Sequence, residues 1–397
     1  MQRGAMHLQV LLLASAQALF QTVSVLVMTV GALAAAQIAS RPELATVPIG
    51  TMFLGTAVVT FPASMWMTRA GRRAGFIVGA LLGVLGGLIA AGGILLGSLA
   101  LLSFGTFLVG AYQAFAQFYR FAASEVSDDT FRPRAISLVL AGGIVAALAG
   151  PMLGRFGAPL LEPEYVGSFL LLALVSLIGV GVMLPLHVPA AKAETDATAG
   201  RPWAAIVSQP AYLVALFGAA TGYGIMILAM TATPIAMVHH HHDLAAAATV
   251  IQLHVLGMFL PSFFTGSLIA RFGVIRIMLA GILVLAGHVL LTLTGTGFGS
   301  FAGALVLLGI GWNFLYVGGT TLLTTTYTAA EKGCAQATND MTIFIVGLAC
   351  SFSAGALLQT FGWQTLNALL LPWLALAALS LMWLGWKRHQ PDPVPAN

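Results

Sequence analysis

The stretch from Gly222 to Phe259 reads GYGIMILAMTATPIAMVHHHHDLAAAATVIQLHVLGMF. Two apolar runs flank four consecutive histidines, which are His239, His240, His241 and His242. Apolar runs of this length are typical of helices that cross a bilayer, whose hydrocarbon core is about 30 Å thick. We therefore predict two antiparallel spans that meet at the histidines, with Asp243 as the N-cap of the second helix.

Methionines and a histidine recur at helical spacing within these two runs. Met226 and Met230 are four residues apart on the first helix, and His254 and Met258 are four apart on the second. Residues at this spacing share one face of a helix. At about 1.5 Å per residue, Met226 and His254 lie roughly 15 Å from the turn, near the middle of the bilayer. Thioether and neutral imidazole groups favour a soft ion, Cu(I) above all, whereas zinc, calcium and magnesium favour thiolate or oxygen ligands.

The composition of the whole chain is that of a membrane protein. Its 397 residues are 59% hydrophobic and only 7% charged, whereas a soluble domain has about a quarter charged residues. Continuous apolar runs disfavour a β-barrel. The net charge of +4 comes from scattered basic residues, so nucleic acid is not an expected partner. No phosphate-binding loop or nucleophile–base pair is evident, so we predict a protein that is not an enzyme.

The apolar runs predict an all-α fold with twelve transmembrane helices joined by short loops. We place these helices at about 8–36, 45–67, 74–97, 99–122, 133–157, 167–187, 208–237, 245–270, 274–295, 300–326, 335–358 and 363–386.

Lysine and arginine placement predicts the orientation of these spans. Of the 16 basic residues, only Arg41 and Arg155 fall on one side of the predicted membrane, and the other 14 fall on the opposite side. Because basic residues accumulate in cytoplasmic loops, both termini are expected in the cytoplasm. The histidine run then faces the outside of a bacterial inner membrane.

A polar segment divides the chain into two halves of six helices. We predict an N-terminal half at 1–188, a cytoplasmic linker at 189–205, a C-terminal half at 206–390 and a cytoplasmic tail at 391–397. The same turn recurs in both halves, 202 residues apart, and we expect it to act in gating. Its residues are Arg69, Gly71, Arg72 and Arg73 in the first half and Arg271 and Gly273 in the second.

Twelve helices in two halves, with a small residue, four spacers and Arg-x-Gly after helices 2 and 8, resemble the major facilitator superfamily. That resemblance implies solute transport by alternating access, with a site near the midplane between the halves. The usual acidic residue of the turn is replaced by Thr68 and Ala270, which puts the family's cytoplasmic charge relay in question. The run Gly142–Gly154 resembles a helix-5 motif of exporters, but we favour the simpler interpretation of a kink at Pro151 with close packing at the glycines.

The paired Met-x-x-x-Met and His-x-x-x-Met motifs resemble the CcoA type of bacterial copper importer, which supplies assembly of cbb3-type cytochrome oxidase. The resemblance implies that Met226, Met230, His254 and Met258 bind the transported copper. A close subgroup of the same family imports riboflavin, so a flavin importer is the main alternative. A drug or solute exporter and a copper-binding scaffold are further alternatives. Residues that could bind a flavin are Tyr112, Tyr119, Trp312, Asn313 and Tyr316.

The remaining expectations concern cargo handling and partners. The histidine run is either an outer capture site for the metal ion or a polar turn that stays hydrated. We interpret His288 as structural. No carboxylate lies near the midplane, and His254 must be neutral to bind a metal ion, so we predict facilitated or weakly coupled import. Copper is expected as cargo and not as a permanent cofactor. The expected partners are the lipid bilayer and a copper chaperone, and the chain is expected to be a monomer.

Overall fold

The computed structural model describes residues 3–41, 44, 47–188, 201–242 and 244–389, and within these ranges it is helical and contains no strand. Residues 189–200 of the predicted linker, Asp243 and the predicted tail lie outside the described residues. The helices are α1 (Arg3–Ile38), α2 (Val47–Ala70), α3 (Arg72–Leu95), α4 (Leu99–Ala116), α5 (Tyr119–Glu125), α6 (Arg132–Ala141), α7 (Gly143–Gly157), η2 (Ala158–Leu160), α8 (Val166–Met183), α9 (Trp203–Val207), α10 (Pro210–His239), α11 (Leu244–Phe259), α12 (Ser262–Phe272), α13 (Val274–Leu293), α14 (Phe298–Leu323), α15 (Lys332–Ala368) and α16 (Leu370–His389).

The number of spans confirms the predicted all-α membrane fold. The described part of the chain holds eleven spans that are long and apolar enough to cross a membrane. A twelfth candidate is the helix pair Lys332–Ser351 and Ser353–Ala368, which is bent by 54°. Gly362 has a φ of 71°, so α15 is interrupted at this residue. The interruption falls in the loop predicted between the helices at 335–358 and 363–386.

Three helices predicted as continuous are interrupted in the structure. The predicted helix 245–270 splits into α11 and α12 because Pro261 has no backbone N–H to continue the hydrogen-bond ladder. The predicted helix 133–157 splits into α6 and α7 at Gly142. The predicted helix 99–122 splits into α4 and α5, where neither proline nor glycine accounts for the break.

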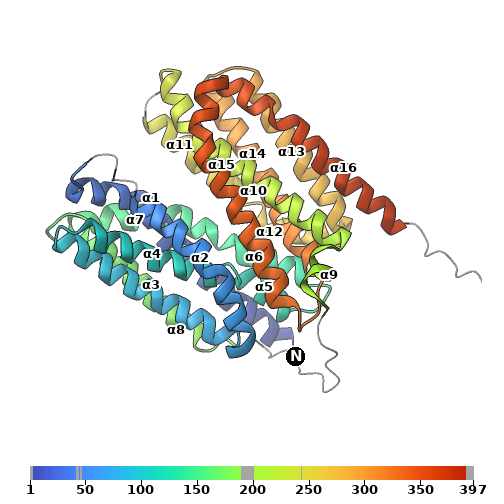
Figure 1. Ribbon diagram of the computed structural model, residues 1–397, viewed down its shortest axis with the longest axis horizontal. Coiled ribbons are helices and arrows are strands. Elements are labelled where there is room, and N and C mark those ends of the chain that lie inside the picture. The colour runs from blue at the N-terminus through green and yellow to red at the C-terminus, as the bar shows by residue number, and fades with distance from the viewer. Residues whose placement is uncertain (1–2, 42–43, 45–46, 189–200, 243, 390–397) are drawn as a thin grey trace, which may run out of the picture. The chain divides into compact units, whose positions relative to one another are not determined.

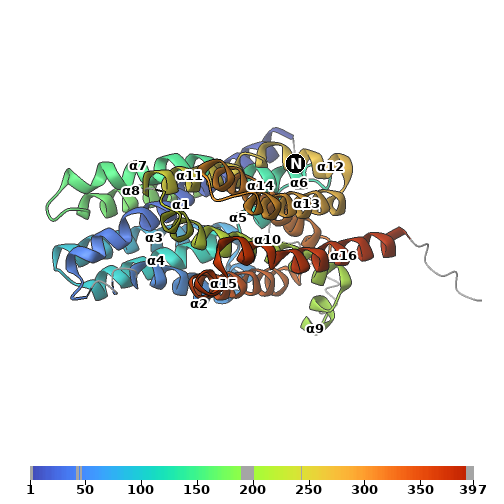
Figure 2. The same ribbon diagram turned by 90° about the horizontal axis from the view of Figure 1, so that it is seen from above.

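The helices form two compact units. Unit 1 comprises Met1–Gly200 together with Thr328–Met341, and unit 2 comprises Arg201–Tyr327 together with Thr342–Asn397. Within unit 1, α3 packs against α4 and α8, and α2 packs against α4 (Figure 1). Within unit 2, α14 is the central helix, because α10, α11 and α13 all pack along it (Figure 2). Any site on α10 or α11 is therefore built around α14.

Close backbone contacts repeat in the two units at the offset seen in the sequence. A Cβ added to Gly55 on α2 would lie 2.2 Å from the Phe107 carbonyl oxygen on α4. A Cβ added to the equivalent Gly257 on α11, 202 positions later, would lie 2.8 Å from the carbonyl oxygen of Val306 on α14. Glycine lets such helix backbones touch because it has no side chain. The internal repeat is thus a repeat of packing as well as of sequence.

The predicted gating turns also share one backbone conformation. Gly71 has φ 89° and ψ 156°, and Gly273 has φ 88° and ψ 150°. Each glycine lies between the end of one helix and the start of the next. Glycine is suited to both turns because residues with a Cβ rarely adopt a positive φ.

We predict that Gly273→Ala lowers thermal stability, because a residue with a Cβ is strained at this combination of φ and ψ by roughly 1–3 kcal/mol. No atom lies within 4 Å of the new Cβ, so crowding makes no contribution. Thermal unfolding of the purified protein in detergent measures the effect.

Gly92→Ala is the matched control, because Gly92 is helical and an added Cβ there also meets no atom within 4 Å. Alanine should be tolerated or should stabilise at that position. Equal melting temperatures for Gly273→Ala and the unmodified protein would contradict the strain argument.

Candidate functional site

The four predicted copper ligands lie on two helices of unit 2. Met226 is buried and Met230 is half-buried on α10, and His254 and Met258 are buried on α11. Both helices pack along α14 and contact each other over a shorter stretch. The structure therefore puts the four residues around one central helix, and their convergence on an ion stays a prediction.

His254 has one hydrogen-bonded nitrogen and one that is available. Its Nδ1 lies 2.9 Å from the carbonyl oxygen of Leu305 on α14, to which it donates. Its Nε2 is buried and meets no partner in the part of the chain that the structure describes. A neutral imidazole with its proton on Nδ1 carries a lone pair on Nε2. His254 thus offers a buried acceptor that fits either a metal ion or an N–H group of a substrate.

A row of aromatic rings runs through unit 2. Trp312 and Tyr316 stack with centroids 4.8 Å apart and planes at 16°. Tyr223 on α10 lies 6.3 Å from Tyr316 and 5.8 Å from Phe344 on α15. Phe259 on α11 meets the Trp312 ring edge-on at 5.9 Å. We call these five residues the aromatic row, and rings of this kind are the groups on which planar heterocycles stack.

The aromatic row also contains a buried donor. Trp312 is 4% exposed, and its Nε1 has no hydrogen-bond partner in the described ranges. Gly309, one turn earlier on α14, touches the backbone of His254 and Met258. The His254 ring lies at the level of Leu305, and the Trp312 ring lies at the level of Phe259, further along the same pair of helices. Together they offer one donor, one acceptor and several ring faces.

Asn313 is buried and braces the break between α11 and α12. Its Nδ2 donates to the Met258 carbonyl oxygen at 2.8 Å and to Ser262 Oγ at 2.6 Å. Its Oδ1 accepts a hydrogen bond from Thr265 Oγ1 at 2.7 Å. The amide thus satisfies a backbone carbonyl next to Pro261, where the helical ladder is interrupted. This bracing role differs from the flavin contact that the sequence suggests for Asn313.

Tyr112 and Tyr119, the other residues suggested for a flavin, lie in unit 1. Both are fully buried. The Tyr112 ring packs edge-on against Phe20 at 5.3 Å, and the Tyr119 ring packs against Phe76 at 4.6 Å. These contacts assign both rings to the packing of unit 1.

The histidine run adopts several environments at one end of unit 2. His241 has a φ of 64° and forms the turn. His242 Nε2 donates to the Thr296 carbonyl oxygen at 2.8 Å. His239 and His240 line a cavity of about 540 Å³, which we call the histidine pocket. The described residues contain no group of three or more His, Cys, Asp or Glu side chains that could hold a metal ion.

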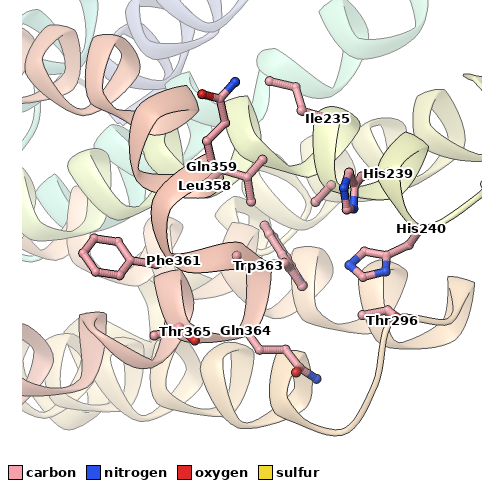
Figure 3. A pocket seen from close by; sticks show the side chains of 12 residues that line it. Ile235, His239, His240, Thr296, Leu358, Gln359, Phe361, Trp363, Gln364 and Thr365 are labelled. Carbon is pink, nitrogen blue, oxygen red and sulfur yellow. The ribbon is translucent and has the colours of Figure 1, made fainter.

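The histidine pocket mixes aromatic and polar walls. Trp363 projects toward the two imidazole rings, and Gln359 and Gln364 add amides from α15 (Figure 3). Partial burial and the neighbouring imidazoles hold the pKa of His240 below its ordinary value. Capture of an ion by the histidine run stays a prediction. His239 and His240 are the candidates for it, because they line the pocket.

The turn after α2 contributes one buried arginine. Arg72 donates to the Glu125 carboxylate at 2.7 Å and also to Gln336, and Lys332 donates to the same carboxylate at 2.8 Å. Arg69 and Arg73 are exposed. These ion pairs join α3, α5 and the start of α15 within unit 1.

A second buried ion pair in unit 1 joins Arg120 and Asp340. Thr68, which replaces the family's acidic residue, lies against Gly333 at the start of α15. Carboxylates at positions other than the turn therefore supply the ion pairs here. In the second turn, the Arg271 guanidinium lies 5.1 Å from the ring centre of Phe272.

Comparison with known proteins identifies the family. The sequence profile of the Major Facilitator Superfamily matches residues 10–253 and 216–397. The chain belongs to this superfamily. It is a multi-pass membrane transport protein and not an enzyme.

Two superfamily relatives match most of the chain. The riboflavin transporter RfnT of Brucella anthropi is 39% identical over 376 residues, which cover 94% of this chain and 94% of that protein. The uncharacterised transporter YddS of Bacillus subtilis is 31% identical over 341 residues, which cover 81% and 78% of the two chains.

Solved structures of superfamily transporters share the fold. The E. coli fucose:proton symporter FucP aligns with a TM-score of 0.78 at 17% identity, covering 96% of this chain and 98% of that chain. A bacterial homologue of the iron transporter ferroportin aligns with a TM-score of 0.72 at 14% identity, covering 96% and 100%.

Part of the aromatic row could have been predicted from the sequence. Trp312 and Tyr316 are four residues apart on one helix face, which favours stacking. Tyr223, Phe259 and Phe344 join the row from three other helices, so no local spacing identifies them.

We predict that Asn313→Leu destabilises this transporter by about 1–3 kcal/mol, because the Met258 carbonyl loses its amide donor in a buried position. Gln252→Leu on α11 is the control, since Gln252 is exposed. Thermal unfolding in detergent compares the two variants. Equal melting temperatures for both would show that Asn313 does not brace the break.

Proposed function

We propose that the chain is a riboflavin importer of the bacterial inner membrane. The similarity to RfnT carries this proposal, because 39% identity extends over 94% of both chains. It supports the flavin alternative better than the copper prediction. The predicted orientation, with both termini in the cytoplasm, follows from the distribution of basic residues.

The aromatic row supports the proposal chemically. An isoalloxazine ring is planar and carries two carbonyl acceptors on either side of an N–H donor. Trp312 Nε1 is a buried donor and His254 Nε2 a buried acceptor, and neither has a partner in the described structure. Ring faces for stacking come from Trp312, Tyr316 and Tyr223. We assign the flavin ring to this part of unit 2.

Uptake of labelled riboflavin by bacteria that lack their own importer tests the proposal. Expression of the chain should restore uptake, and flavin analogues should compete. Trp312→Ala should weaken apparent affinity by about 10- to 100-fold, the effect of losing one stacked ring.

Trp383→Ala is the control, because Trp383 is 46% exposed and lies outside the aromatic row. Its uptake should match that of the unmodified chain. Absence of uptake from cells with the protein in their membrane, or equal uptake by both tryptophan variants, would refute the assignment.

Copper import is the second candidate, and the free Nε2 of His254 favours it. With Met226, Met230 and Met258, this nitrogen completes a charge-neutral ligand set suited to Cu(I). Copper imported in this way would supply cytochrome oxidase assembly through a chaperone, and His239 and His240 would receive the ion first.

Copper accumulation in intact cells separates the two candidates. A copper importer should lose accumulation in Met230→Leu and keep it in Met152→Leu, since Met152 is 69% exposed. A riboflavin importer should show no copper accumulation above cells without the chain.

A further inference from the structure

His288 on α13 is fully buried and has a hydrogen-bond partner at each ring nitrogen. Its Nδ1 lies 2.8 Å from the carbonyl oxygen of Ala304 on α14. Its Nε2 lies 3.0 Å from Oδ1 of Asn367 on α15. All of these residues belong to unit 2.

Both partners of His288 are acceptors. A backbone carbonyl oxygen cannot donate. The orientation of the Asn367 amide is fixed, because its Nδ2 donates to the Trp363 carbonyl oxygen at 2.8 Å. Turning the amide over would bring two oxygens together and lose that bond. A neutral imidazole has only one N–H, whereas the protonated ring has two. We propose that His288 is a proton-binding site, in which the ring holds a second proton between Ala304 and Asn367.

His254 provides a contrast on the other side of α14. It donates to Leu305, the neighbour of Ala304, and leaves its second nitrogen without a partner. The two histidines therefore meet consecutive carbonyl groups of one helix. His254 also interacts electrostatically with His288, so charging both rings together is unfavourable. The proton accordingly belongs to His288, the ring with two acceptors.

No carboxylate neutralises a proton at this position. The elements packed against α13 include α12, α14 and α16, whose titratable residues with described side chains are Arg271, Tyr316 and Lys387. The part of α15 after Met341, which carries Asn367, adds only Cys350 among its described residues. Asp and Glu are absent from α11 to α14, from α16 and from the described part of α15 after Met341. Two charge-assisted hydrogen bonds to neutral acceptors hold the proton instead. Its binding therefore depends on both acceptors staying in place.

The Asn367 acceptor lies on a segment with a built-in break. Gly362 has a left-handed backbone, and Asn367 follows five residues later. Trp363, whose carbonyl orients Asn367, also lines the histidine pocket. A shift of this segment would withdraw Oδ1 from His288 and release the proton. A role for this proton in driving import rests on the proposed function, whereas the proton site itself does not.

Nitrogen NMR of the full chain in lipid bilayers, with ¹⁵N-labelled histidine, tests the site directly. As the pH is lowered from 8 to 5, His288 should gain a second protonated nitrogen at a higher pH than His254, because His288 has two acceptors and His254 has one. The chain has nine histidines, so His288→Gln and His254→Gln variants assign the two buried rings.

The Asn367→Leu variant removes one acceptor while keeping His288. Its His288 ring should stay singly protonated across the same pH range. In the unmodified chain, a His288 that stays singly protonated down to pH 5, or that gains its second proton only at a lower pH than His254, would overturn the proposal. So would a doubly protonated ring that persists in Asn367→Leu. Thermal unfolding in detergent checks that each variant is folded, and where His288→Gln fails to fold, the signal that is unchanged in His254→Gln and buried from solvent assigns His288.

Riboflavin uptake into proteoliposomes tests the role in coupling. An inward proton gradient should raise uptake at least several-fold in the unmodified chain, and His288→Gln should show the same uptake with and without the gradient. Gradient-stimulated uptake by His288→Gln would refute the coupling role. Absence of riboflavin uptake under all conditions would count against the proposed function, and the NMR result would still decide the proton site.

Discussion

Hydrocarbon supplies no hydrogen-bond partners, so a polar atom inside a membrane-spanning chain needs a partner in the protein or in a bound ligand. Unit 2 meets this requirement at Asn313, whose amide satisfies the backbone next to Pro261. Among the described side chains of unit 2, two buried atoms do not meet it, Nε2 of His254 and Nε1 of Trp312. Both lie on the pair of helices α11 and α14, His254 at the level of Leu305 and Trp312 at the level of Phe259. A substrate with its own donors and acceptors would supply the hydrogen-bond partners that these two atoms lack.

The same requirement separates the two buried histidines. His254 and His288 both donate to consecutive carbonyl groups of α14, so their first hydrogen bonds are alike. Their second nitrogens differ, because one has no partner and the other meets the oxygen of Asn367. One ring can therefore accept from a ligand, and the other can hold a proton. Within unit 2, α14 is thus next to a candidate substrate site and a candidate proton site.

The fold could be predicted from the sequence because each membrane-spanning helix requires a long apolar run, and these runs can be counted. The turns at Gly71 and Gly273 could be matched from the sequence, and their backbone angles agree within a few degrees. Helix interruptions were harder to predict, since the break between α4 and α5 has no local cause. The sequence identified His254 by its depth, yet its free nitrogen depends on where Leu305 lies. His288 was interpreted as structural because no methionine lies four residues from it and its helix is usually peripheral in this fold. Its contact with Asn367, 79 residues later in the chain, could not be foreseen from spacing.

The account depends most on the aromatic row as the place where a flavin binds. Riboflavin fluorescence is quenched when its ring stacks on tryptophan or tyrosine, so titration of riboflavin with the purified protein in lipid nanodiscs measures this contact directly. We predict saturable quenching that is lost in Trp312→Ala and retained in Trp383→Ala. Saturable quenching that Trp312→Ala leaves unchanged, or no quenching by the folded protein, would contradict the account.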